Sequence, residues 1–221
     1  EFRKYFNTAV SGGVGEYKSY LIKYEERDAQ RIDKLLDLLD KNGIRYHTGS
    51  GTGRGYNYDS GKEEAFSVNN NDIVISAYQP RSAMVKVLFE PRSRLSDSVT
   101  YDITAWALPY VYGLQAYASK EKISTGVEPA RIKVVNAETS YGYVMPWAGV
   151  RTVKATGQLL QKGIILRYAE QPFELDGKRF DRGTVLILKT SNKKAGANLW
   201  KLVREVADAN TIRLYPVSGG M

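Results

Sequence analysis

The two halves of the sequence carry the same landmarks in the same order. Leu38–Tyr46 (LLDKNGIRY) resembles Leu159–Tyr168 (LLQKGIILRY), and in each a glycine separates an apolar helical stripe from a strand-like run. A glycine at this place is the usual left-handed cap of a helix C-terminus. Gly61–Ile75 and Gly177–Ile187 also match, since each holds a Gly-Lys pair, a phenylalanine and an apolar strand. Such self-similarity predicts an internal duplication of a strand–helix–strand–hairpin–helix unit.

Helical and strand-like patterns alternate through both halves. Apolar residues with the spacing of one helix face precede Gly43 and Gly163 and surround Val203. The pair Asp176-Gly177 lies between two β-forming runs and predicts a type I′ hairpin turn. Strands that alternate with helices predict an α/β or α+β fold rather than an all-β fold.

Composition divides the chain into three parts. Residues 1–15 are expected to be the tail of a preceding element followed by a glycine-rich joint. Residues 16–125 are expected to form the first α/β unit, which includes an aromatic seam at 96–119. Residues 126–221 are expected to form the second unit, which is basic. The polar connector before Pro129 marks the boundary between the units.

The aromatic seam, Ser96–Ser119, contains four tyrosines and one tryptophan and follows no single period. A short helix, capped by a serine and ended by Pro109, is expected within it. Its place between the two similar units favours a role in joining them. The alternative is a surface that binds a peptide or a glycan by stacking and hydrogen bonding. The candidate ligand contacts are Tyr101, Asp102, Trp106, Tyr110 and Tyr112.

Asp102 is the one carboxylate inside the aromatic run. It either contacts a ligand among the aromatic rings or stabilises the local turn. In the second case it accepts backbone amides near a helix start or pairs with Arg92 or Arg94. The structural role is the favoured interpretation.

The composition excludes several classes of protein and site. At 221 residues, 43% hydrophobic and 25% charged, the chain matches a soluble globular protein. No apolar run approaches the roughly 20 residues that span a bilayer, and no signal peptide begins the sequence. Zero cysteine excludes disulfides, thiolate nucleophiles and cysteine-ligated metals. The start at Glu1, without an initiator methionine, predicts a segment of a longer protein.

The net charge of +8 lies in the second half. Residues 129–221 hold 15 Lys/Arg against 7 Asp/Glu, whereas residues 1–128 are neutral. Such an excess suits nucleic acid or another anionic partner. Because the basic residues are spread singly, apart from the pairs Lys178-Arg179 and Lys193-Lys194, a solvated face or a face that docks on an acidic neighbour is favoured, and nucleic acid is not an expected partner.

Gly49–Gly55 (GSGTGRG) has glycine at every second position. A phosphate-binding loop requires a helix directly after it. The strand-like Tyr56-Asn57-Tyr58 follows instead, so a mobile hairpin loop is expected.

No catalytic or metal-binding constellation is visible in the sequence. His47 is the only histidine, and a zinc site of the His/Glu kind requires at least two. A Ser-His-Asp triad requires His47 as its base, but no nucleophile motif accompanies it. We therefore predict no catalytic residue, no metal ligand and no cofactor in this chain.

Three segments suggest a family. Phe89–Ser98, Tyr101–Pro109 and Phe180–Ile187 resemble a region of large bacterial zinc carboxypeptidase-like proteins. In that family the region follows the N-terminal metallocarboxypeptidase domain and leads into a glutamine amidotransferase-like C-terminal domain. The resemblance covers about residues 16–221.

The resemblance implies an exported parent protein, periplasmic or secreted, in which zinc-dependent proteolysis of peptide or cell-wall substrates belongs to another domain. The family's zinc ligands and general-base glutamate have no counterpart here. The chain is then expected to be a non-catalytic scaffold or substrate-presenting segment, with the adjoining peptidase and amidotransferase-like domains as its partners.

Overall fold

The computed structural model describes residues 1–92, 107–129, 134–139 and 141–219 and divides into two compact units. The units are Glu1–Arg131 and Ile132–Met221. All strand pairs of the described residues are antiparallel, and helices accompany both sheets. The expected mixed fold of helices and strands is therefore confirmed. Within the described residues no helix is long and apolar enough to cross a membrane.

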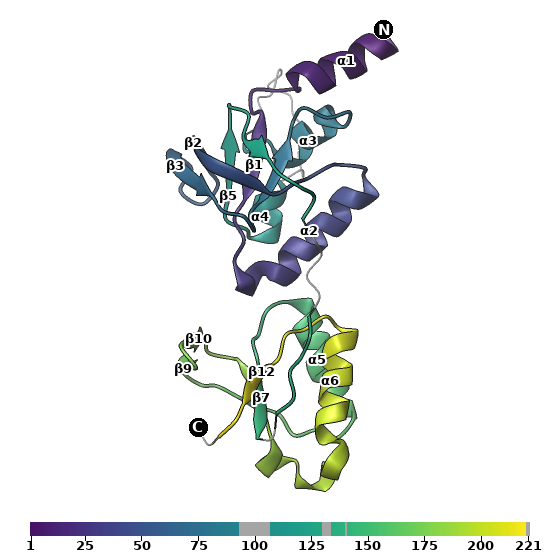
Figure 1. Ribbon diagram of the computed structural model, residues 1–221, viewed down its shortest axis with the longest axis vertical. Helices are drawn as coiled ribbons and strands as arrows, with labels where there is room; N and C mark the ends of the chain where they lie inside the picture. The colour runs from purple at the N-terminus through teal and green to yellow at the C-terminus, as the bar shows by residue number, and fades with distance from the viewer. Residues whose placement is uncertain (93–106, 130–133, 140, 220–221) are drawn as a thin grey trace, which may run out of the picture. The chain divides into compact units, whose positions relative to one another are not determined.

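The first unit consists of a twisted sheet with helices on one face (Figure 1). β1 lies between β4 and β5, and the order across the main path is β3-β2-β5-β1-β4, with β6 paired to β2. Its elements are α1 (Phe2–Gly12), β1 (Ser19–Ile22), the 3-10 helix η1 (Glu26–Asp28), α2 (Ala29–Lys41), β2 (Gly49–Asn57), β3 (Glu63–Val68), β4 (Ile73–Ser76), α3 (Ser82–Phe89), α4 (Leu108–Tyr112), β5 (Ala116–Ser119) and β6 (Ser124–Thr125).

Alternation along β1 supplies two cores on the two faces of this sheet. Tyr20 and Ile22 face the helices, where they join the buried stripe of α2 and Phe89 of α3. Leu21 faces the other way and meets Phe66 of β3. Each large apolar side chain buried in this manner contributes roughly 1.5–3 kcal/mol to folding.

The second unit has the same two-faced construction around β7. The sheet order is β12-β7-β11-β8, and the β9–β10 hairpin forms a separate sheet (Figure 1). Its elements are β7 (Gly142–Met145), α5 (Val150–Gln161), β8 (Arg167–Tyr168), β9 (Phe173–Leu175), β10 (Lys178–Phe180), β11 (Val185–Leu188), the 3-10 helices η2 (Lys189–Ser191) and η3 (Lys193–Asn198), α6 (Leu199–Ala209) and β12 (Tyr215–Val217).

This order is the split βαβ arrangement of ferredoxin-like folds with a hairpin inserted between β8 and β11. In the first unit, His47 follows α2 and bridges Val74 of β4, as β8 follows α5 and pairs with β11. The β2–β3 hairpin lies between them in the chain. An origin of both units by duplication stays a prediction.

The hairpin turn of the second unit has the backbone that its sequence predicts. Asp176 and Gly177 both have positive φ, at 49° and 73°, as a type I′ turn requires. Phe180 of this hairpin packs on Val144 and Val217. The hairpin thereby covers the sheet face opposite α5 and α6.

Residues 1–15 contain the helix α1, which ends at Gly12. The expectations for the aromatic seam meet a different structure. Pro109 does not end a helix. It lies in the first turn of α4, where a backbone N–H has no acceptor within the helix, so the missing N–H of proline costs no hydrogen bond. The end of the aromatic seam forms β5, an inner strand of the first sheet. The serines expected to cap a helix, Ser96 and Ser98, lie outside the described residues.

Candidate functional site

The alternating glycines belong to a strand, so the expected mobile loop at residues 49–55 is wrong. Gly49–Asn57 is β2, in which every second residue faces the same side. A Cβ on Gly53 would stand 2.8 Å from Cζ of Phe66, and one on Gly55 would stand 2.6 Å from the carbonyl oxygen of Ala118. The glycines therefore let the Phe66 ring and the neighbouring strand approach the β2 backbone closely.

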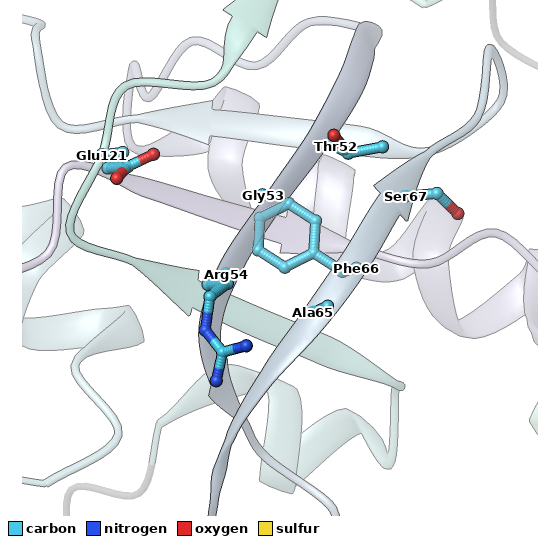
Figure 2. A pocket seen from close by; sticks show the side chains of 7 residues that line it. All are labelled: Thr52, Gly53, Arg54, Ala65, Phe66, Ser67 and Glu121. Atoms are coloured by element: carbon cyan, nitrogen blue, oxygen red, sulfur yellow. The ribbon is translucent and has the colours of Figure 1, made fainter.

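A shallow open groove of about 550 Å³ lies on the β2–β3 hairpin. Figure 2 shows the Phe66 ring beside Gly53, with Thr52 and Ser67 to its right and the charged Arg54 and Glu121 to its left. The remaining lining residue is Ala65. The groove thus combines two hydroxyls, a guanidinium, a carboxylate and a small apolar patch.

The two charged groups of the groove have no counter-ion in the part of the chain that the structure describes. Arg54 Nη2 donates to the carbonyl oxygen of Glu63 at 3.4 Å, which is a weak contact. The Glu121 backbone N–H donates to Ser119 Oγ at 3.2 Å, and no ion pair of its carboxylate occurs among the described residues. Arg54 therefore remains available to an acidic ligand group.

β3 ends the strand order and presents an open edge next to this groove. Asn57 N–H donates to the Lys62 carbonyl at 2.8 Å, which makes 57–62 a hydrogen-bonded pair. Because such pairs alternate along an antiparallel ladder, Glu64, Phe66 and Val68 point their N–H and C=O groups toward β2. Glu63, Ala65 and Ser67 point theirs away from β2, along the outer edge.

One end of the edge is partly covered. Lys23 Nζ donates to the Ser67 carbonyl at 2.8 Å and also pairs with Asp72. Ala65 has no hydrogen-bond partner for its N–H or C=O among the described residues. Ala65 is therefore the centre of the open edge.

Of the five candidate ligand contacts that the sequence suggests, the structure describes two, Tyr110 and Tyr112. Tyr101, Asp102 and Trp106 lie outside the described residues. Tyr110 and Tyr112 lie on α4 and do not line the groove.

Tyr110 and Tyr112 are held by the first unit's own side chains. The Tyr110 hydroxyl lies 3.3 Å from that of Tyr56, and its ring meets Tyr58 edge to face with centroids 5.1 Å apart. Burial and, after it, the hydrogen bond to Tyr56 raise the pKa of Tyr110. The Tyr112 carbonyl accepts from Arg31 at 3.2 Å. Arg92 lies over the Tyr56 ring, 5.3 Å from its centroid.

The structure places the single histidine in the backbone ladder of the first sheet. His47 exchanges both backbone hydrogen bonds with Val74, at 2.9 and 2.7 Å, so it extends the sheet. No group of three or more His, Asp or Glu in the described ranges is placed to hold a metal ion. Glycine composition alone predicts turns at residues 49–55, but the spacing of two between these glycines is a strand signal, and it is the feature of the sequence that points to this groove.

Comparisons with known proteins give this chain no relative. No protein-family model matches it, and neither a curated protein nor a solved structure does.

Proposed function

We propose that the first unit is a non-catalytic module that binds an extended peptide segment by strand addition to β3. The open edge centred on Ala65 carries this proposal. An added strand forms hydrogen bonds with the unpaired backbone N–H and C=O groups of the edge, while pockets beside the edge select side chains of the added strand. Each such bond contributes roughly 0.5–1.5 kcal/mol net, so a segment that pairs with Glu63, Ala65 and Ser67 binds with moderate affinity.

Arg54 gives the groove a preference for an acidic residue. In the ladder Arg54 lies directly opposite Ala65. Because alanine is small, the long Arg54 side chain extends past it and reaches the outer carbonyl of Glu63. A glutamate or aspartate of the added strand, opposite Ala65, is then within reach of the guanidinium.

The resemblance to zinc carboxypeptidase-like proteins suggests which longer protein the chain belongs to. We propose that this chain is the non-catalytic scaffold or substrate-presenting segment of an exported metallocarboxypeptidase, periplasmic or secreted, whose zinc belongs to another domain. Strand addition is a direct means of presenting a peptide. Its adjoining domains are the proposed partners.

The aromatic stretch 101–117 supports a second candidate, a peptide or glycan surface. Tyr110 is 39% exposed although its hydroxyl and ring are fixed by Tyr56 and Tyr58. A rigid, partly exposed tyrosine is a suitable stacking platform. Titration of a Tyr110→Ala variant with muropeptides tests this candidate separately from the β3 edge.

The test of strand addition uses a short labelled peptide of alternating valine and threonine with a central glutamate. Fluorescence anisotropy measures its binding to the unchanged chain and to Ala65→Pro. Proline at 65 removes an outward N–H and none that β2 uses, so the fold is retained while the edge is blocked. Ala65→Ser, which keeps the N–H, is the matched control.

We expect Ala65→Pro to weaken binding at least tenfold and Ala65→Ser to leave it within about twofold. Arg54→Gln should reduce the preference for glutamate over a lysine-substituted peptide. Circular dichroism confirms that the variants fold. Equal binding by Ala65→Pro and the unchanged chain contradicts the proposal, as does absence of binding to both peptides.

A further inference from the structure

The helix α5 of the second unit has two apolar faces and uses only one of them in the fold. Ala155 and Leu159 are buried in the core beside α6, and Thr152 is buried on the same side. This face accounts for the packing of α5 on its own unit.

The other face carries a second apolar row. Val150, Val153, Gly157 and Leu160 follow one another at intervals of three and four residues, which places them on one side of the helix. Val150 is 84% exposed, Val153 51% and Leu160 55%. Trp147, just before the helix, is 51% exposed as well. A contiguous exposed row of this kind marks an interaction surface.

Gly157 shapes this row for close contact. Nothing lies within 4 Å of the position that its Cβ would occupy, so no packing within the described chain requires glycine there. Glycine inside a helix lowers helix stability. Between Val153 and Leu160 it leaves a notch in which a side chain of a facing helix fits.

The charged residues of α5 itself all have one sign. Val150–Gln161 contains Arg151 and Lys154 and no acidic residue. Basic residues near a helix N-terminus oppose the helix dipole, which favours acidic ones. The local sequence therefore departs from what helix stability favours, and such departures occur at functional surfaces.

We propose that the exposed row of α5 docks an acidic amphipathic helix of a partner protein. The apolar row supplies the buried stripe, and the partner's carboxylates meet Lys154 at the rim. A second copy of this face fits poorly because it presents the same positive charge. The inference concerns the second unit and does not depend on peptide binding by β3.

The experiment measures binding of a labelled helical peptide with leucines on one face and glutamates on the others. Its twin, with lysine at every glutamate position, tests the charge requirement. Binding is measured by fluorescence anisotropy on the intact chain at low and high salt. The variants are Val153→Glu and Lys154→Glu, and the control is Lys201→Glu at an exposed site on α6.

We expect the acidic peptide to bind and the lysine twin to fail. Val153→Glu should weaken binding at least tenfold, because it places a carboxylate in the stripe without disturbing a buried residue. Lys154→Glu should weaken it several-fold and reduce its salt dependence, while Lys201→Glu should not.

Two results overturn the inference. One is absence of binding, or equal binding by the unchanged chain and Val153→Glu. The other is binding to anionic phospholipid vesicles that requires Val153, with no binding of the acidic peptide. The second result would identify the row as a membrane-surface contact.

Discussion

Among the described helices, three end in the same hydrogen-bonded cap, and one residue in these caps is poorly suited to its backbone. After α2, α5 and α6 the capping residues are Gly43, Gly163 and Thr211, with φ of 63°, 74° and 54°. In each, the next residue is a buried isoleucine whose N–H bonds back into the helix, at 2.8–3.0 Å. This is the Schellman motif, in which a left-handed residue is required.

Thr211→Gly should stabilise the chain, and Gly163→Ala should destabilise it. A β-branched residue at positive φ is strained, whereas glycine is not. Nothing lies within 4 Å of a Cβ at Gly163, so the cost of alanine there is backbone strain alone. Thr211→Gly should raise the free energy of unfolding by about 1 kcal/mol, and Gly163→Ala should lower it by about 1 kcal/mol, as measured by urea denaturation. A destabilised Thr211→Gly variant would contradict the interpretation.

Tyr20 should make the free energy of unfolding fall at alkaline pH. It is buried against Phe89, and burial raises its pKa. Above pH 10 the unfolded chain releases this proton while the folded chain retains it, so stability present below pH 10 is lost as pH rises. The loss is roughly 1.4 kcal/mol per pH unit for one such group.

Tyr20→Phe should change stability little at pH 7 and make the alkaline loss shallower. The Tyr20 hydroxyl has no hydrogen bond among the described residues, so little is removed. Urea unfolding across pH 9–12 measures this. Tyr58→Phe is the contrasting variant. The Tyr58 hydroxyl donates to the Phe89 carbonyl, so its removal should lower the free energy of unfolding already at neutral pH. An unchanged pH profile in Tyr20→Phe would contradict the assignment.

At the scale of elements, the sequence predicts those whose signals are local. The stripe of α2, the glycine after it and the Asp176-Gly177 turn each depend on residues close in the chain, and each has its predicted structure. The β2 strand does not depend on local signals. Its glycines are required by contacts with Phe66 and Ala118, which are distant in sequence. Residue types alone predict a loop at these positions.

The candidate site could not be predicted for the same reason. Which backbone groups of β3 face outward depends on its register with β2, and the openness of the edge depends on the whole strand order. The aromatic seam has an unusual composition, and its described part contributes to the fold: Leu108, Ala116 and Ala118 belong to the main core of the first unit.

At the scale of the molecule, each unit has its own cores and its own proposed surface. In the first, helices cover one face of the sheet and the β2–β3 hairpin the other, which leaves β3 as an open edge. In the second, α5 retains an exposed apolar row on a basic background. The proposed roles, one for an extended strand and one for an acidic helix, follow from these separate constructions.

Amide hydrogen exchange resolved by residue tests strand addition to β3 most directly. On saturation with the glutamate-containing peptide, the amides of Ala65 and Ser67 should gain protection, because they acquire partners in the added strand. Those of Glu64 and Phe66 should change little, since they already face β2. A bound peptide that leaves Ala65 and Ser67 unprotected, or that protects only residues outside β3, would contradict the account.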